Sequence, residues 1–218
     1  MHRVVWDLHS APLDAPKGLN FFGPTAGPLV PPGRYTVRLT ANGKSYTAPL
    51  QVLQDPRVQL TPAQTAEEVQ TMRTITDRAN AIFDDAKRLN DVRDQVKTIV
   101  AHARDLPDSA AVTTTGKQLA AQLDSLSVEL VQPNHTNGQD IINFPNGVVD
   151  QWLYLAGSVD GSYMPVTNGV KQRLADLQQQ WSLVQARIDN LLGARITAFN
   201  TMLGGKAAVI VPRPTPHP

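Results

Sequence analysis

The sequence has 218 residues, enough for one large domain or two small domains with separate apolar cores. Its 20 Lys and Arg residues nearly balance 19 Asp and Glu residues without long blocks of either sign, which argues against nucleic-acid or membrane-surface binding. The absence of cysteine excludes disulfides, thiolate zinc sites and a cysteine nucleophile. The sequence contains no run of about 18 apolar residues and no signal-peptide pattern at its start, so it predicts no membrane span.

Strand signals lie in the first part of the chain. Arg3–Leu8 predicts a short strand, and the proline-rich residues 10–32 predict a surface connection. Gly33–Ala41 alternates apolar and polar side chains, which predicts a half-buried strand. Asn42-Gly43 favours a type I′ turn, and Ser45–Leu53 alternates again, so these residues predict a β-hairpin.

Helical patterns begin after a shift in composition near residues 55–61. This shift predicts a boundary between a β segment, residues 1–57, and a helical bundle, residues 58–218. Thr61 and Pro62 suit the cap and first position of a helix. Apolar or small residues at intervals of three and four then predict a long amphipathic helix that ends near Arg104: Met72, Ile75, Ala79, Ile82, Ala86, Leu89, Val96, Val100 and Ala103.

Further helices follow breaks in the pattern. The stretch Thr113–Gly116 predicts a break, after which Leu119, Leu123, Leu126 and Leu130 form a second stripe. We expect a loop over Asn134–Gly147, a helix over Val148–Val159, and a last long helix capped by Thr167. The stripe of the last helix is Leu174, Leu177, Trp181, Val184, Ile188, Leu191, Ala198 and Met202. Ala207–Val211 is compatible with a returning strand before a proline-rich tail.

These elements predict an α+β fold. Its β part is expected to be a partial immunoglobulin-like β-sandwich segment, because three strands are few for a free-standing sandwich. Its helical part is expected to be an antiparallel helical hairpin or a three-helix bundle.

Several segments in order carry a resemblance to a known family. His2–Leu8, Pro31–Leu39 and Gln51–Arg57 resemble the C-terminal region of bacterial sortilin-like, BNR-repeat glycosyl hydrolase proteins. Leu153–Gly157 and Pro165–Thr167, with the following helix, are similar to the helical hairpin that closes those chains. The resemblance covers most of the sequence.

The resemblance implies a secreted bacterial protein with an N-terminal β-propeller, an immunoglobulin-like domain and a helical appendage. It implies an extracellular or periplasmic location. Relative to that pattern, the sequence begins partway into the sandwich and the propeller is missing. The hydrolase label of the family rests on the propeller, so the resemblance carries no catalytic, cofactor or metal residue over to this chain.

Titratable residues show no pattern of an active site. His2, His9, His102, His135 and His217 are scattered without metal-ligand spacing, and surface or terminal positions are expected for them. The neighbouring Asp84 and Asp85 adjoin Lys87 and Arg88, which favours a solvated helix face over paired catalytic carboxylates. The sequence therefore predicts no enzyme, no cofactor and no metal site.

The remaining distinctive residues have mainly structural interpretations. Arg93 and Arg195 fall on helical stripes, where they either pair across the helices or extend outward. Trp6 with Asp7 is either a core anchor or a sugar-stacking pair. Three aromatic residues on helical stripes are predicted to lie in the core: Trp152, Tyr154 and Trp181. Asn134–Thr136 fits the N-glycosylation acceptor, which matters only in a secretory cell.

Two functions are therefore expected from different classes. The first is a non-catalytic structural and interaction module that packs against its own propeller or a partner chain, with possible self-assembly through an open sheet edge. The second is a carbohydrate-binding accessory module of a secreted glycan-active enzyme, which exposure of Trp6 and Tyr35 in a sugar-sized groove favours and burial of both excludes.

Overall fold

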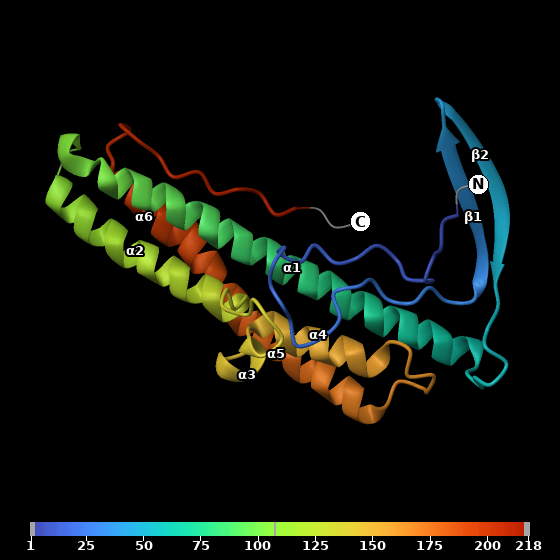
Figure 1. The fold of residues 1–218 in the computed structure, drawn as a ribbon. Helices are drawn as coiled ribbons and strands as arrows, with labels where there is room; N and C mark the ends of the chain where they lie inside the picture. The colour runs from blue at the N-terminus through green and yellow to red at the C-terminus, as the bar shows by residue number, and fades with distance from the viewer. Residues whose placement is uncertain (1–2, 107, 216–218) are drawn as a thin grey trace.

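The computed structural model describes residues 3–106 and 108–215 and has an α+β fold (Figure 1). A two-stranded antiparallel sheet, β1 (Gly33–Ala41) and β2 (Lys44–Val52), precedes the helices. The helices are α1 (Pro62–Ala101), α2 (Ser109–Leu130), α3 (Asp140–Asn143), α4 (Val148–Val159), α5 (Asn168–Asn190) and α6 (Ile196–Met202). The predicted α+β class is confirmed, whereas the described residues form no sandwich.

Helix α1 is the long axis of the helical bundle. Thr61 and Gln64 form a capping box at its start, as the Thr61-Pro62 pair predicts. One part of α1 packs antiparallel against α2, another part against α4, and α5 with α6 forms a further layer (Figure 1). The predicted apolar stripe is buried from Met72 to Val96, and Phe83 and Val92 widen it. Val100 is partly buried, and Ala103 is buried beyond the end of α1. No described helix is both long enough and apolar enough to span a membrane.

Gly116 lies inside α2, so the predicted helix break at Thr113–Gly116 is wrong. The residue is buried where α2 approaches α1 and α6. A Cβ atom on Gly116 would lie 2.3 Å from Cγ2 of Val100 and 3.2 Å from the ring of Phe199. The glycine therefore permits close helix packing, and its cost in helix propensity is tolerated for that reason.

A π-helical segment, Leu191–Arg195, joins α5 to α6. Its wider turn adds a residue and shifts the buried stripe, so that the residues buried after Ile188 are Leu192, Ile196, Phe199 and Leu203. The sequence pattern placed Leu191, Ala198 and Met202 there instead. This part of the prediction is wrong because an unbroken period of 3.6 residues does not hold across the π-helical segment.

Residues 3–32, which precede the hairpin, lie across the helices as an irregular segment that we call the strap (Figure 1). The strand predicted at Arg3–Leu8 is absent from the described residues of that range, and Leu8 has a positive φ of 66°. Farther along, Leu13 is buried in the helical core, and the ring of Phe21 contacts the ring of Phe83 edge-on at 5.2 Å. The strap therefore contributes to the helical core. The predicted division at residues 57 and 58 stays a prediction.

The described end of the chain runs back along α1 without forming the strand expected at Ala207–Val211 (Figure 1). Hydrogen bonds with side-chain amides, and not with a neighbouring strand, fix the backbone of this segment. Asn200 exchanges two hydrogen bonds with the backbone of Val209, and Gln95 exchanges two with the backbone of Ile210. Of the proline-rich tail, residues 216–218 lie outside the described residues.

Candidate functional site

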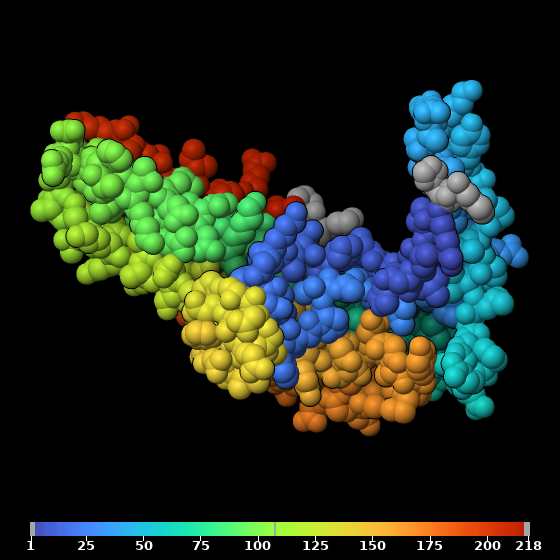
Figure 2. Space-filling view, in the orientation of Figure 1, coloured from blue at the N-terminus to red at the C-terminus, as the bar shows by residue number. Residues whose placement is uncertain are grey.

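The β1–β2 hairpin extends away from the helical bundle as a separate arm (Figure 2). Its predicted turn is confirmed: Asn42 and Gly43 have φ values of 49° and 73° and connect the paired residues Ala41 and Lys44. The arm is exposed on both faces over most of its length. The predicted half-burial of these strands is therefore wrong for the described chain.

The two faces of the hairpin differ strongly in chemistry. Directly opposite residues of the hairpin share a face. The pairing register therefore places eight side chains on what we call the apolar face, with Lys44 at its tip: Tyr35, Val37, Leu39, Ala41, Tyr46, Ala48, Leu50 and Val52. The opposite, polar face carries Arg34, Thr36, Arg38, Thr40, Ser45, Thr47, Pro49 and Gln51. On the apolar face, Val37 is 51% exposed, Leu39 61% and Tyr46 58%. This is an amphipathic ribbon whose apolar face is partly buried at its base and exposed beyond it in the described chain.

The register also determines which backbone groups point away from the hairpin. Ala41 and Lys44 flank the two-residue turn and therefore form a hydrogen-bonded pair, and such pairs alternate along an antiparallel ladder. The N–H and C=O groups of Arg34, Thr36, Arg38 and Thr40 consequently point outward from β1. Across the described chain, no backbone hydrogen bond joins this outer edge to another segment.

Trp6 and Tyr35 lie together at the base of the arm. Their ring centroids are 5.9 Å apart in an edge-on contact, the Tyr35 hydroxyl donates a 2.6 Å hydrogen bond to the carbonyl of Pro31, and Trp6 Nε1 donates to the carbonyl of His9 at 2.8 Å. Trp6 is 41% exposed. Neither ring lines the cleft described next, so the carbohydrate-binding alternative stays a prediction.

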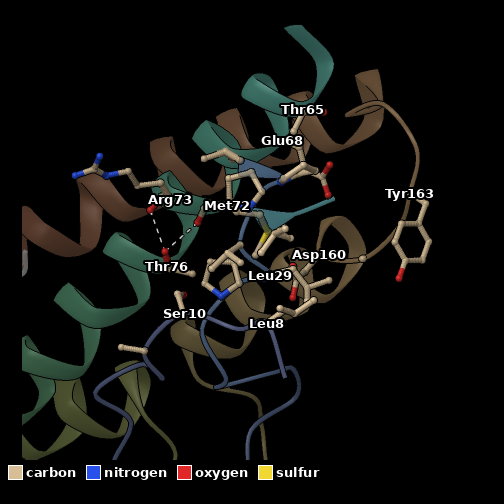
Figure 3. A pocket seen from close by; sticks show the side chains of 18 of the residues that line it. Leu8, Ser10, Leu29, Thr65, Glu68, Met72, Arg73, Thr76, Asp160 and Tyr163 are labelled. Carbon is tan, nitrogen blue, oxygen red and sulfur yellow. Dashed lines mark hydrogen bonds between the residues drawn. The ribbon is translucent and has the colours of Figure 1, made fainter. Parts of the chain in front are cut away.

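A cleft of about 800 Å³ lies between the strap, the base of the hairpin and the first turns of α1. Glu68, Met72 and Thr76 from α1 face residues of the strap and the loop after α4 across it (Figure 3). The strap and loop residues include Leu8, Ser10, Leu29, Asp160 and Tyr163. Its volume is in the range of small-ligand sites, and most of its wall is apolar.

The charged groups of the cleft are mainly acidic. Asp160 accepts a hydrogen bond of 3.1 Å from the backbone of Leu29, and Arg73 pairs with Asp77 at 3.7 Å. Burial, with a smaller effect of the Asp160 charge, raises the pKa of Glu68. Among the described residues, no group of three or more His, Asp or Glu side chains is placed to hold a metal ion.

The histidines occupy different environments. His102 is exposed at the end of α1, and His9 is partly exposed in the strap, as expected. His135 is instead 1% exposed, so the expectation of a surface position is wrong for it. It lies beside the buried Asp150, which no sequence pattern singled out. His2 and His217 lie outside the described residues.

Asp85 is also buried, contrary to the expectation that it lies with Asp84 on a solvated face. It is 6% exposed and pairs with Arg88 at 2.6 Å. Burial raises the pKa of the Asp85 carboxyl, and the charge of Arg88 opposes this effect. Asp84 is partly exposed and binds the backbone of Thr215 at 3.1 Å. Both acids hold structure together and do not form a catalytic pair.

The two arginines expected on the helical stripes differ in outcome. Arg93 of α1 binds Asp124 of α2 at 2.7 Å, so it pairs across the helices. Arg195 is exposed, because the π-helical segment turns it away from the stripe, and its nearest partner is Gln122 at 3.5 Å. Both arginines therefore have structural positions on the bundle.

The helical aromatic residues are divided between core and surface. Trp152 and Trp181 are buried, and the Arg78 guanidinium lies 5.3 Å from the Trp181 ring centroid. Tyr154 is 58% exposed and stacks on Phe22 of the strap, so its predicted core position is wrong. Asn134 is exposed in the loop before α3.

Sequence reasoning assigned Arg34 and Arg38 to the polar face of the first strand but did not single out Pro49. Pro49 interrupts the outer edge of β2, and Arg34 and Arg38 place positive charge beside the outer edge of β1. The Asn42-Gly43 turn was a sufficient signal, because it fixes the strand register, and the place of each residue on the hairpin follows from that register.

No protein-family model matches the chain, and neither a curated protein nor a solved structure shows significant similarity to it.

Proposed function

We propose that the chain is a non-catalytic interaction module whose hairpin docks, through its apolar face, against β structure of a neighbouring domain or a partner protein. The observation that carries the proposal is the exposure of Val37, Leu39 and Tyr46 on one face of an isolated two-stranded ribbon. Contiguous exposed apolar side chains on a soluble protein are typical of binding surfaces.

The energetics of a hairpin support this proposal. An isolated two-stranded hairpin is only marginally stable in water, whereas a third strand or a packed face makes it stable. Within the described chain, only the base of the arm is covered, where Tyr35 and Leu50 are partly buried and Trp6 of the strap contacts the Tyr35 ring. A partner that covers the rest of the apolar face gains the burial of three large side chains, each contributing about 1.5–3 kcal/mol when fully buried.

The sequence resemblance supports a specific setting for the module. In that setting, the chain is the C-terminal accessory region of a larger exported β-propeller protein, extracellular or periplasmic, and the hairpin is part of an immunoglobulin-like sandwich. The propeller or sandwich strands then supply the cover of the apolar face. Any glycosyl hydrolase activity is then assigned to the propeller, as the resemblance implies.

Site-specific photo-crosslinking tests this function in the native cells. A photoreactive phenylalanine derivative is placed at Leu39, in the protein as those cells produce it, and crosslinked peptides are identified by mass spectrometry. We expect crosslinks to a β-rich segment outside residues 1–218. The matched control is the same group at Leu183, which is 68% exposed on α5 and distant in sequence from the hairpin.

Comparison of the Leu39 and Leu183 positions distinguishes a specific partner from non-specific hydrophobic association. Crosslinks at Leu39 to one defined segment, without that segment at Leu183, support the proposal. Absence of any crosslink at Leu39, or the same set of products at both positions, contradicts it.

A further inference from the structure

We propose that the outer edge of β1 binds an extended strand of a partner in which apolar residues alternate with acidic residues. This inference rests on the proposed docking function and specifies the partner. It adds a backbone contact along one edge to the packing of the apolar face, and it assigns a charge pattern to the bound strand.

The choice of β1 over β2 follows from backbone chemistry. The outward positions of β1 are Arg34, Thr36, Arg38 and Thr40, and each carries both a donor and an acceptor. On β2 the outward position opposite Thr36 is Pro49, which has no N–H. Proline is one of the features that protect an edge strand from pairing, and β1 lacks it. The edge of β1 is therefore the one that accepts another strand.

The alternation in the partner follows from the two faces of the ribbon. A strand added to β1 points successive side chains to opposite faces. Those on one side extend the apolar face formed by Val37 and Leu39, and those on the other side lie beside Arg34 and Arg38. A strand with apolar residues at every second position matches the first side.

The acidic residues follow from the two arginines. Within the described chain, neither Arg34 nor Arg38 forms an ion pair or a side-chain hydrogen bond. Both arginines lie on the polar face of β1, where Thr36 is the one position between them. Cross-strand pairs of opposite charge stabilise a sheet, whereas like charges directly opposite destabilise it. Asp or Glu at the intervening positions of the partner therefore complements this edge.

The same charges disfavour a second copy of this chain as the partner. Pairing β1 with β1 of another molecule, apolar faces aligned, brings the Arg34 and Arg38 side chains of both copies onto one polar face. Such a sheet gathers positive charge without a matching acid from the described strands. Self-assembly through this edge is accordingly the less favourable outcome, and the test below detects it.

Two synthetic peptides test the charge pattern directly. One alternates Val with Glu, the other alternates Val with Lys, and both are extended, capped at their termini and labelled with a fluorophore. Titration of each with the full chain, followed by fluorescence anisotropy at low and high salt, measures the dissociation constants. We expect the Glu peptide to bind at least about tenfold more tightly, with the difference reduced by salt because surface charges are screened.

A matched pair of proline variants tests the edge. Thr36→Pro removes an outward N–H from β1, and Thr47→Pro removes an outward N–H from β2, while neither removes a hydrogen bond within the hairpin. We expect Thr36→Pro to weaken binding of the Glu peptide at least about tenfold and Thr47→Pro to leave it within about twofold. Cross-strand NMR contacts between Leu39 and Tyr46 confirm that each variant keeps the hairpin.

A double charge reversal, Arg34→Glu with Arg38→Glu, is expected to invert the preference toward the Lys peptide. Equal loss of binding in both proline variants, equal affinity for both peptides, no saturation at millimolar peptide, or a dimer formed by the free chain through β1 overturns the inference. If crosslinks at Leu39 still identify a β-rich partner, the docking function stands and only strand addition at this edge fails.

Discussion

His135 Nδ1 lies 3.9 Å from Asp150 Oδ2, and both side chains are 1% exposed. The Asp150 carboxylate also accepts hydrogen bonds of 2.8 Å from the backbone of Phe22 in the strap and from the backbone of Gly147 at the start of α4. The carbonyl of His135 accepts a hydrogen bond from the backbone of Asn20. This buried pair therefore ties the strap to the helical bundle.

Asp150→Ala is expected to destabilise the fold by about 3 kcal/mol, because it leaves buried donors without an acceptor. Urea unfolding measures the change, and limited proteolysis is expected to cleave the strap near Phe22 before the helices. Asp176→Ala, at an exposed position of α5, is the control. An unfolding free energy within about 0.5 kcal/mol of the unmodified protein would show that the pair is not a structural anchor.

Gly116→Ala is expected to destabilise the bundle by about 1–3 kcal/mol, although alanine has the higher helix propensity. The added Cβ meets Val100 at 2.3 Å. The double variant with Val100→Ala removes the obstructing methyl groups, so it should cost less than the sum of the single changes. Gly193→Ala is the control, since a Cβ there meets nothing within 4 Å. Thermal unfolding compares the four proteins, and a neutral or stabilising Gly116→Ala contradicts the packing role.

Deletion of Gly193 tests the register shift in the last long helix. Removing one residue from Leu191–Arg195 converts the π-helical turn to an α-helical turn and keeps Ile188 and Ile196 on their buried faces. Deletion of the exposed Gln178 instead rotates the helix on one side by about 100° and moves buried residues to the surface. Circular dichroism during heating should show a near-normal melting temperature for the first variant and a large decrease for the second. The reverse order contradicts the assignment.

The hairpin, the starts of α1 and α5 and most of the α1 stripe were predictable because each depends on a local signal: a turn pair, a capping residue or a regular period. Gly116 was misread because a glycine that permits packing and a glycine that ends a helix are identical in sequence. The prediction of the buried residues after Ile188 was wrong, because the π-helical segment changes the helical period and no sequence signal marks that change. Burial of Asp85 and His135, and the composition of the cleft, depend on segments distant in sequence.

Glu68→Gln is expected to stabilise the protein at pH 7. The pKa of Glu68 is raised above its ordinary value of 4.5, first by burial and then by the charge of Asp160. The folded state therefore binds more protons than the unfolded state above pH 4.5, and its stability decreases as pH rises through the folded pKa. The glutamine variant should have the higher melting temperature at pH 7, and the difference should disappear below pH 4.5.

Glu67→Gln is the control for this titration, because the neighbouring Glu67 forms an ion pair with Lys171 at 2.5 Å. We expect that change to be neutral or slightly destabilising at pH 7. If the Glu68→Gln variant is less stable than the unmodified protein at pH 7, the charged Glu68 carboxylate does not destabilise the folded state, and the prediction is wrong.

Hydrogen exchange at the β1 amides tests the proposed addition of a partner strand to the docking hairpin most directly. In the isolated chain, the outward amides of Thr36, Arg38 and Thr40 should exchange rapidly, and the inward amides of Val37 and Leu39 more slowly. In the protein isolated from its native cells with its partner or neighbouring domain, the account predicts that the outward amides become protected. Outward amides that are already protected in the isolated chain, or that stay unprotected in the native assembly, would contradict strand addition at β1.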